Sequence, residues 1–512
     1  LLVLAYFFYQ LYKKTHQQVE FKNSQSDIIY KRRWYFFVLF SMVLGIYGSF
    51  SFKPLKWKDA FVFKDNFKSY LALNPLQNFF TTLRFRTPDV DNQSIKTAYK
   101  EVANFLQLEP QVQANHSFER TLYPSSRALE SKPNIVLVIC ESFSMYKSSM
   151  SGNVLNSTPY FNQLTKEGIF FDRCFTPHFA TARGVFATLT GIPDVQLSKF
   201  SSRNEESINQ HTIINSFDEY NKFYFIGGSS EFNNYRGLLN NIKGVKLYEE
   251  GSYTSPKVNV WGISDKDLFK ESNTILKQQQ KPFFAIIQTA DNHRPYTIPE
   301  SDKDFIKKDI PKDTLEKYGF LSVAEYNAFA YMDYCIQHFI EAAKKEKYFE
   351  NTIFVFVGDH GVEGNASAMY PDVWTKNRLS DEHVPLLLYA PSLLQPKLHN
   401  EVVSQIDVLP TIAGLVHLPY LNTTLGRDVL NPKKKGNGAF VIHHDEGKIG
   451  WVSDSFYFIK NIRFEQEQLL PLTGNKITWN ANEEAALKKK YSAFTTSFYE
   501  AAKWMLLNNK PK

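Results

Sequence analysis

The sequence predicts an α/β fold in which helices flank a mostly parallel sheet, followed by a small antiparallel subdomain. From Pro133 onward, short β-branched and apolar runs alternate with helical patterns, which is typical of a parallel sheet covered on both faces. After Gly436 alternating runs are separated by Asp/Gly turns, which indicates antiparallel strands. The length of 512 residues allows one large domain with smaller pieces attached.

Five runs are predicted to form the central sheet. They are NIVLVICE (134–141), KFYFIGG (222–228), PFFAIIQTAD (282–291), TIFVFVGDH (352–360) and VPLLLYAP (384–391). Between the third and fourth runs, apolar residues recur at helical spacing in EYNAFAYMDYCIQHFIEAAKK (325–345), which predicts an amphipathic crossover helix. At the end of the chain, residues 439–470 are predicted to form the antiparallel strands and residues 486–507 a helix that closes them.

The N-terminal segment predicts a membrane anchor. Residues 1–12 are largely apolar and look like the end of a cut membrane helix, so we expect the chain to be a fragment. The basic stretch 13–33 is typical of a cytoplasmic loop. Residues 34–52 carry no charge, and at about 1.5 Å per residue they cover the roughly 30 Å hydrocarbon layer. A buried core helix is the alternative, but the charged flanks and aromatic ends favour a span, which places everything after Lys53 outside the cytoplasm.

These patterns divide the chain into four parts. We expect residues 1–52 to be the C-terminal part of a multi-span membrane domain and residues 53–132 to be a juxtamembrane helical linker. Residues 133–435 are predicted to form the catalytic domain, and residues 436–512 the C-terminal antiparallel subdomain and helix.

Charge and cysteine content exclude two classes of protein. The net charge of +7 comes without basic blocks interleaved with aromatic residues, so we expect no nucleic-acid partner. Cys140, Cys174 and Cys335 lie in apolar runs, which indicates buried thiols and excludes a disulfide framework.

Two predicted strands end at residues of the types that commonly bind metals. The first run ends on Glu141, and the fourth ends before Asp359 and His360. Charged groups placed directly after buried strands need a partner or a cation, and reactive groups gather at the carboxyl ends of parallel strands. Carboxylates with one imidazole suit a divalent cation such as Mn²⁺, Mg²⁺ or Zn²⁺. The alternative for each residue alone is an ordinary position in a surface loop.

Thr181 allows two interpretations. It precedes Ala-Arg-Gly and an apolar run, so its hydroxyl can cap a helix. A hydroxyl at a helix N-terminus beside a divalent cation is also a position where an alkoxide forms readily.

The order of these motifs resembles a known family. NIVLVICESF, the threonine before Arg-Gly, DNHRPYTIP, FVGDHG and QIDVLPTIAGL are similar to the lipoteichoic acid synthase group, the phosphoglycerol transferases of the alkaline phosphatase and sulfatase superfamily. The resemblance runs from about Trp34 to Leu430. It implies a mixed sheet of the alkaline phosphatase/sulfatase type and a multi-pass anchor in the bacterial cell membrane with an extracytoplasmic catalytic domain. It also implies an enzyme that moves an alkylphosphate group from a phospholipid donor to a glycan or lipid acceptor, through a phospho-threonine and with one divalent cation, foremost Mn²⁺.

The resemblance assigns roles by motif. Glu141, Thr181, Asp359 and His360 become the metal ligands, with Thr181 also the nucleophile. The resemblance implies that His293 and Arg236 bind substrate. Two further candidates come from their positions: Arg183, two residues after Thr181, could offset phosphoryl charge if it turns inward rather than to solvent, and His383, just before a predicted strand, could approach the metal or substrate.

One segment departs from the family pattern. After the second strand the synthases carry a His-x-Asp pair and a Trp-x-Arg, whereas GGSSEFNNYRG has Gly227, Ser229 and Asn234 at those places and keeps only Arg236. Transfer of phosphoethanolamine, or phosphodiester hydrolysis, therefore stays open as an alternative. A sulfatase is a more distant one, because oxidation of a threonine gives a ketone and TARG lacks the Pro-Ser-Arg of those enzymes. The last alternative is a non-catalytic membrane scaffold. HHDEG (443–447) is interpreted as a hairpin turn.

Overall fold

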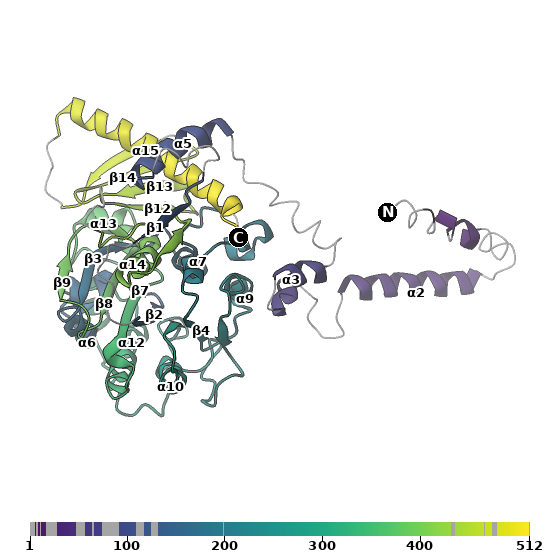
Figure 1. Ribbon diagram of the computed structural model, residues 1–512, viewed down its shortest axis with the longest axis horizontal. Helices are drawn as coiled ribbons and strands as arrows, with labels where there is room; N and C mark the ends of the chain where they lie inside the picture. The colour runs from purple at the N-terminus through teal and green to yellow at the C-terminus, as the bar shows by residue number, and fades with distance from the viewer. Residues whose placement is uncertain are drawn as a thin grey trace.

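The computed structural model describes most of the chain from residue 132 onward and parts of the N-terminal region (Figure 1). The described residues are 6, 9–10, 12–16, 28–47, 57–63, 66–73, 92–108, 117–123, 132–197, 199–431, 436–464, 466–473 and 479–510.

The central sheet is mixed. Its order is β10-β3-β8-β7-β2-β6-β4-β5, with β9 beside β3. The bounds are β2 (Asn134–Cys140), β3 (Ile169–Phe175), β4 (Asn221–Ile226), β5 (Lys246–Tyr248), β6 (Phe283–Gln288), β7 (Thr352–Gly358), β8 (His383–Tyr389), β9 (Lys397–His399) and β10 (Val403–Ser404). Strand β2 is parallel to β6 and β7, and β6 is parallel to β4. All five predicted strands are confirmed.

Two features of the sheet differ from the prediction. Strand β8 runs antiparallel to both β7 and β3, so the sheet is less parallel than the strand pattern indicated. Strand β3 was not predicted, because Asp172 and Arg173 interrupt its apolar run. Those two residues lie at a register shift between Phe171 and Cys174 and are only half-buried, so the usual alternation is broken there.

Helices cover both faces of this sheet, and strand β2 shows why. Ile135, Leu137 and Ile139 pack into one core cluster, whereas Val136 and Val138 pack into the other. A strand that is buried on both faces reads as one continuous apolar run. The described helices of the catalytic domain are α6 (Pro159–Leu164), α7 (Thr181–Thr190), α8 (Glu205–Ile208), α9 (Tyr235–Leu239), α10 (Asp265–Leu276), α11 (Lys312–Lys317), α12 (Val323–Ala343), α13 (Asp372–Lys376) and α14 (Val408–Leu415). Helix α12 is the predicted crossover helix, and the three cysteines are buried free thiols, as expected.

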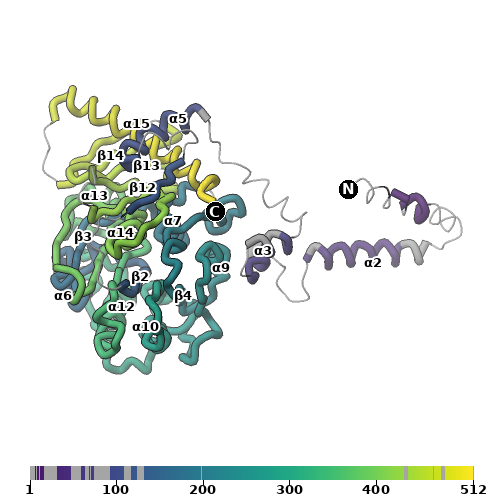
Figure 2. The backbone as a smooth tube through the Cα atoms, in the orientation of Figure 1, coloured from purple at the N-terminus to yellow at the C-terminus, as the bar shows by residue number. Residues whose placement is uncertain are grey.

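The C-terminal subdomain is the expected antiparallel sheet with a closing helix. Its strands β12 (Ala439–His443), β13 (Lys448–Val452), β14 (Phe456–Asn461) and β15 (Glu467–Pro471) pair in sequence order. Helix α15 (Ala481–Asn508) lies along this sheet and against α5 (Asn92–Phe105) (Figure 2). Trp451 lies at the centre of this contact, with its ring 5.3 Å from that of Phe105 and 4.6 Å from that of Phe494.

Two hydrogen-bonded connections tie other segments to the domain built on the central sheet. The N–H of Ile442 on β12 donates to the carbonyl of Pro177, at 2.7 Å, just before α7. Strand β1 (Arg120–Leu122) pairs with β11 (Tyr420–Asn422), which attaches the chain before the sheet to the far side of the domain.

The N-terminal region contains α2 (Ile28–Tyr47), the 3-10 helix η1 (Trp57–Val62) and α3 (Asn66–Ala72). Within the described ranges, no helix is both long enough and apolar enough to span a bilayer. Helix α2 begins at Ile28, includes the basic residues 31–33 and continues into the uncharged stretch from Trp34. Most of residues 1–12, and residues 48–52 of the second expected span, lie outside the described residues.

Candidate active site

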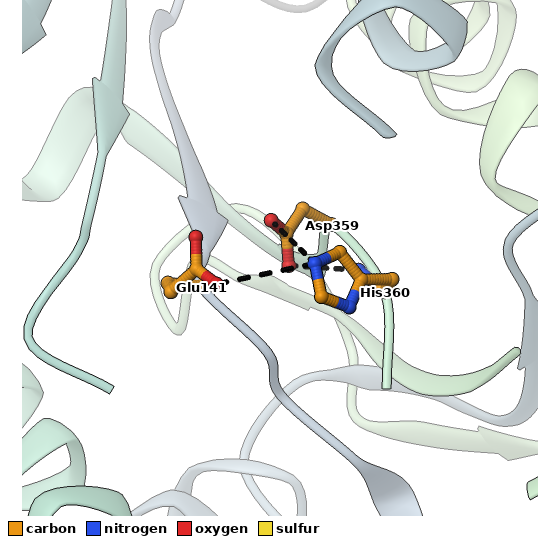
Figure 3. A group of neighbouring side chains, drawn as sticks. All are labelled: Glu141, Asp359 and His360. Atoms are coloured by element: carbon orange, nitrogen blue, oxygen red, sulfur yellow. Dashed lines mark hydrogen bonds and ion pairs between the residues drawn. The ribbon is translucent and has the colours of Figure 1, made fainter. Parts of the chain in front are cut away.

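Three metal-type ligands meet at the carboxyl ends of two adjacent strands. Glu141 follows β2, while Asp359 and His360 follow β7, and the last residues of the two strands are paired in register. One ligand atom from each of the three residues lies within 4.8 Å of the others. His360 Nε2 is 3.6 Å from Asp359 Oδ2 and 3.9 Å from Glu141 Oε1 (Figure 3). The structure therefore brings together the residues that the strand ends predicted.

Thr181 joins this cluster from the start of α7. Its hydroxyl oxygen lies 3.2 Å from Glu141 Oε2 and 3.3 Å from His360 Nε2. The N-cap of α7 is Ala180, and the side chain of Thr181 is directed to the cluster, so the interpretation as a helix cap is wrong. Ala180 itself has a φ of +93°, a conformation that costs an alanine of order 1–3 kcal/mol. This strain is located immediately before the hydroxyl.

The surrounding groups orient the ligands toward a common point. Asp359 Oδ1 accepts hydrogen bonds from the N–H groups of Ser142 and His360, both at 2.7 Å. The hydroxyl of Ser142 donates to Glu141 Oε1 at 2.7 Å. Nδ1 of His360 donates to the carbonyl of Gly361 at 2.6 Å, which leaves the lone pair of Nε2 directed into the cluster.

Asp359 Oδ2 has no hydrogen-bond partner among the described residues although it is buried. A buried carboxylate oxygen without a donor is costly unless a cation neutralises it. The group of Glu141, Asp359 and His360 can therefore bind a metal ion, and its oxygen-rich donor set suits Mn²⁺, Mg²⁺ or Zn²⁺.

Burial raises the pKa values of both carboxyl groups. The pKa of Glu141 rises to about 7 because the side chain is desolvated and because Asp359 lies beside it. Burial likewise raises the pKa of Asp359 to about 7. Without a cation, these two negative charges are disfavoured at neutral pH, and a divalent ion removes that penalty.

A cavity of about 390 Å³ opens directly above the cluster. Glu141, Thr181 and His360 form its floor, and the predicted substrate residue His293 lines it. Aromatic side chains form much of its wall, namely Phe179, Phe200, Phe232, Tyr235 and Trp261. An apolar cavity with a few convergent polar groups is the usual form of a ligand site.

Three of the predicted substrate residues lie elsewhere. Arg236 is paired with Glu249 and donates to the Ser230 hydroxyl at 3.2 Å, so its guanidinium does not line the cavity. Arg183 is buried and donates to the carbonyls of Asp194 and Gln196, both at 3.0 Å.

His383 is also outside the cavity. Its ring stacks on Phe175 at 4.9 Å, and its Nε2 donates to the carbonyl of Asp172 at 2.7 Å. Burial lowers the pKa of this imidazole to about 3, so His383 is a neutral core residue in this structure.

Sequence reasoning missed Arg203, Asn233, Tyr235 and Trp261, which all line the cavity. Arg203, Asn233 and Trp261 come from loops and 3-10 turns, and Tyr235 begins the short helix α9, so periodicity carries no signal for them. One indication was available for Asn233 and Tyr235, since both lie in the segment GGSSEFNNYRG that departs from the family pattern.

Comparison with known proteins places the chain in a family. A family model described as Sulfatase matches residues 133–418. Lipoteichoic acid synthase 2 of Bacillus subtilis is 25% identical over 393 residues, which cover 72% of this chain and 59% of that protein. Lipoteichoic acid synthase of Staphylococcus aureus is 24% identical over 454 residues, covering 80% of this chain and 68% of that protein. For the B. subtilis synthase 2 the chain thus spans less than two thirds of the relative's length.

Two solved structures share the fold. A protein of the alkaline phosphatase superfamily from Vibrio parahaemolyticus aligns with a TM-score of 0.65 and 22% identity, covering 83% of this chain and 98% of that one. The lipoteichoic acid synthase LtaP from Listeria monocytogenes aligns with a TM-score of 0.63 and 18% identity, covering 81% and 99%. The matched region includes both strands that bear the metal-type ligands, and with more than half of its length matched the chain belongs to the sulfatase family, with an alkaline phosphatase/sulfatase-like α/β fold.

Proposed function

We propose that this chain catalyses metal-dependent transfer of an alkylphosphate group, of the phosphoglycerol type, from a phospholipid to a glycan or lipid acceptor. The observation that carries the proposal is the position of the Thr181 hydroxyl, 3.2 Å from Glu141 Oε2 at the floor of the cavity. The similarity to proteins named lipoteichoic acid synthase supports the type of reaction.

Thr181 acts as the nucleophile. Its oxygen forms a bond to the phosphorus of the donor while the bond from phosphorus to the diacylglycerol oxygen breaks. The hydroxyl proton is released toward Glu141 Oε2. His293, at the cavity wall, is the candidate to protonate the departing diacylglycerol oxygen.

The second half of the reaction restores Thr181. An acceptor hydroxyl attacks the phospho-threonine and gives its proton to His293, which lost one in the first half. The new bond from phosphorus to the acceptor oxygen forms, the bond to Thr181 breaks, and the proton taken up by Glu141 returns to the Thr181 oxygen. A divalent cation held by Glu141, Thr181, Asp359 and His360, foremost Mn²⁺, would favour the alkoxide of Thr181 and offset phosphoryl charge.

Two variants test this proposal. Thr181→Ala should abolish diacylglycerol release from phosphatidylglycerol vesicles in the presence of Mn²⁺, because it removes the hydroxyl that contacts both Glu141 Oε2 and His360 Nε2. Thr181→Ser should retain part of the activity, and mass spectrometry of quenched wild-type protein should find the alkylphosphate on the peptide that contains Thr181. Full turnover by Thr181→Ala would end the proposal.

A second candidate keeps the chemistry and changes the cargo. Gly227 and Ser229 stand where the family resemblance implies His and Asp, so phosphoethanolamine transfer or phosphodiester hydrolysis remains the alternative. Head-group release from phosphatidylglycerol and from phosphatidylethanolamine, each with and without an acceptor glycolipid, separates the three reactions.

The proposed location is the bacterial cell membrane, with residues 1–52 as the end of a multi-span anchor, residues 53–132 as linker, and residues 133–435 and 436–512 as extracytoplasmic domains. The uncharged run after Trp34 supports this arrangement. In the described structure, the side-chain amide of Asn240, just after α9, donates to the carbonyl of Phe63 at 2.9 Å. The linker therefore contacts the end of the helix whose first residue, Tyr235, lines the cavity. A thiol introduced at Lys132 should react with an impermeant maleimide on intact cells, and a thiol at Lys22 should not.

A further inference from the structure

Two buried polar groups face the cavity without partners. The side chains of Asn233 and Tyr235 are 6% and 1% exposed, and both line the cavity. Neither the Oδ1 atom of Asn233 nor the hydroxyl of Tyr235 has a partner in good hydrogen-bond geometry among the described residues, although Asn233 and Gln288 are polar neighbours of the Tyr235 hydroxyl. Such groups are costly when buried unless a ligand or water satisfies them. Together they offer one acceptor and one donor to whatever enters the cavity.

The loop that carries these groups is held in an unusual conformation. Asn233 and Asn234 have φ values of +51° and +58°, which non-glycine residues rarely adopt. The amide of Asn234 donates to the carbonyl of Ser202 at 3.0 Å and so ties this loop to the 3-10 turn η5 (Ser201–Arg203). Consecutive strained residues are typical of ligand sites, because surrounding contacts must hold them in place.

Arg203 brings a positive charge to the same wall. Arg203 lines the cavity, is an exposed residue, and makes no ion pair within the described part of the chain. The guanidinium lies 5.5 Å from the ring of Phe200, another wall residue. By contrast, Arg236, which the family resemblance would place here, is neutralised by Glu249.

The space for a side chain at Gly227 is already filled. An added Cβ at Gly227 would lie 2.9 Å from the carbonyl oxygen of Ile263, and one at Gly228 would lie 2.6 Å from that of Trp261. Trp261 is fixed there, since its indole N–H donates to the carbonyl of Arg294 at 2.7 Å. This chain therefore cannot hold the histidine of the family pattern at Gly227 in this backbone.

Acidic groups are scarce in the cavity. Among the described residues that line it, Glu141 is the only carboxylic acid, and its two oxygens already accept hydrogen bonds from Ser142 and Thr181. An ammonium group in this cavity would meet the charge of Arg203 and no free carboxylate.

We propose that Asn233, Tyr235 and Arg203 form a head-group subsite that binds an uncharged, hydroxyl-bearing phospholipid head group and rejects an ammonium head group. The inference rests on the proposed function for the identity of the donor as a phosphodiester lipid. Asn233 Oδ1 and the Tyr235 hydroxyl bind head-group hydroxyls, and Arg203 attracts the phosphodiester charge. These residues replace the side chains that are missing from GGSSEFNNYRG.

The test measures binding separately from turnover. Thr181→Ala protein with Mn²⁺ is titrated by calorimetry with three short-chain lipids: phosphatidylglycerol, phosphatidylpropanol, which lacks the head-group hydroxyls, and phosphatidylethanolamine. We expect phosphatidylglycerol to bind most tightly. In this background, Tyr235→Phe should lower the affinity for phosphatidylglycerol by about 3- to 10-fold, as expected for loss of a neutral hydrogen bond. The affinity for phosphatidylpropanol should not change.

Replacement of the charge has a different signature. Arg203→Gln should lower the affinities for both phosphatidylglycerol and phosphatidylpropanol by about 10-fold, in line with loss of a charge-assisted bond. The ratio of phosphatidylglycerol affinity to phosphatidylethanolamine affinity should become smaller. Tyr123→Phe and Arg463→Gln are the matched controls, because both side chains are exposed outside the cavity. Neither should change any of the three affinities.

Two outcomes would overturn the subsite. One is equal loss of phosphatidylglycerol and phosphatidylpropanol in Tyr235→Phe, and the other is tighter binding of phosphatidylethanolamine than of phosphatidylglycerol before any cavity substitution. If the lipids bind as expected but the wild-type protein releases no diacylglycerol from any of them, the subsite stands and the proposed transferase function fails.

Discussion

Gly184, in the first turn of α7, packs directly against the backbone of Asp359. A Cβ added at Gly184 would lie 2.2 Å from the carbonyl oxygen of Asp359, closer than any real contact allows. The neighbour is backbone, so no side chain can move aside. The glycine of TARG thus determines how closely the helix that presents Thr181 approaches the strand end that presents Asp359 and His360.

Gly184→Ala should therefore damage the metal site. The added methyl group must push α7 and the Asp359 backbone apart, which typically costs about 1–3 kcal/mol. We expect at least a tenfold loss of Mn²⁺ affinity by calorimetry. Gly45→Ala is the control, since an added Cβ in α2 meets nothing within 4 Å. Unchanged Mn²⁺ affinity in Gly184→Ala would show that the helix position does not determine the site.

Ala180→Gly should stabilise the protein. Glycine adopts a φ of +93° without the penalty that alanine pays, so we expect the free energy of unfolding to rise by about 1 kcal/mol. Ala187→Gly, within the regular part of the same helix, should lower it by about 0.5–1 kcal/mol. Chemical denaturation measures the free energy of unfolding of both variants. A lower value in Ala180→Gly than in wild type would show that residue 180 is not strained.

Metal affinity should depend on pH in a defined direction. In the metal-free protein the pKa values of Glu141 and Asp359 are raised to about 7, so protons compete with the cation below that pH. Mn²⁺ affinity should rise as pH increases from 5 to about 8, with proton release on binding that is largest near pH 6. Calorimetry in buffers of different ionisation enthalpy measures that release. Asp359→Asn should release fewer protons.

The same shifts predict the stability of the metal-free protein. Both carboxyls have folded pKa values above the unfolded value near 4, so the native state holds more protons than the unfolded chain between about pH 4 and pH 7. Stability without metal should therefore fall as pH rises through this window, and Mn²⁺ should restore it at pH 8. Thermal melts with and without chelator test the sign. A metal-free protein that becomes more stable from pH 5 to pH 7 would contradict these assignments.

His444→Ala should slow catalysis without removing the metal. His444 Nε2 lies 2.7 Å from the carbonyl of Asp194 and also contacts the guanidinium of Arg183, two residues after Thr181. Loss of this support loosens α7, so kcat should fall about tenfold, an effect of about 1.4 kcal/mol, with Mn²⁺ affinity and KM nearly unchanged. His338→Ala, exposed on α12, is the control. A wild-type kcat in His444→Ala would show that this contact does not support catalysis.

The metal-type ligands could be predicted because each directly follows a strand. Glu141 and Asp359 are separated by more than two hundred residues, yet a parallel sheet brings the ends of β2 and β7 to one edge. The role of Thr181 depended on the family resemblance, since nothing local distinguishes it from a helix cap. The antiparallel direction of β8 could not be predicted, because a strand buried on both faces has the same pattern in either direction.

The remainder of the cavity depends on contacts that no short pattern encodes. Arg236 was expected at the site, but its guanidinium forms an ion pair with Glu249, just after β5. The turn that carries Arg203 is held by a hydrogen bond from the left-handed residue Asn234 to Ser202, a contact between segments that no local pattern predicts. The sequence motif HHDEG was interpreted as a simple hairpin, and the structure shows that its second histidine also contacts Arg183 on helix α7.

The hydrogen bond from Ile442 to Pro177 has a consequence for when the active site matures during synthesis. Strand β12 leaves the ribosome long after α7, so the segment that leads into Thr181 gains this backbone partner only once residues 439–443 have been made. A nascent or truncated chain that stops before Gly436 contains every metal-type ligand and lacks this support. Folding of the C-terminal subdomain against Pro177 thereby becomes a late step in fixing the segment that leads into Thr181.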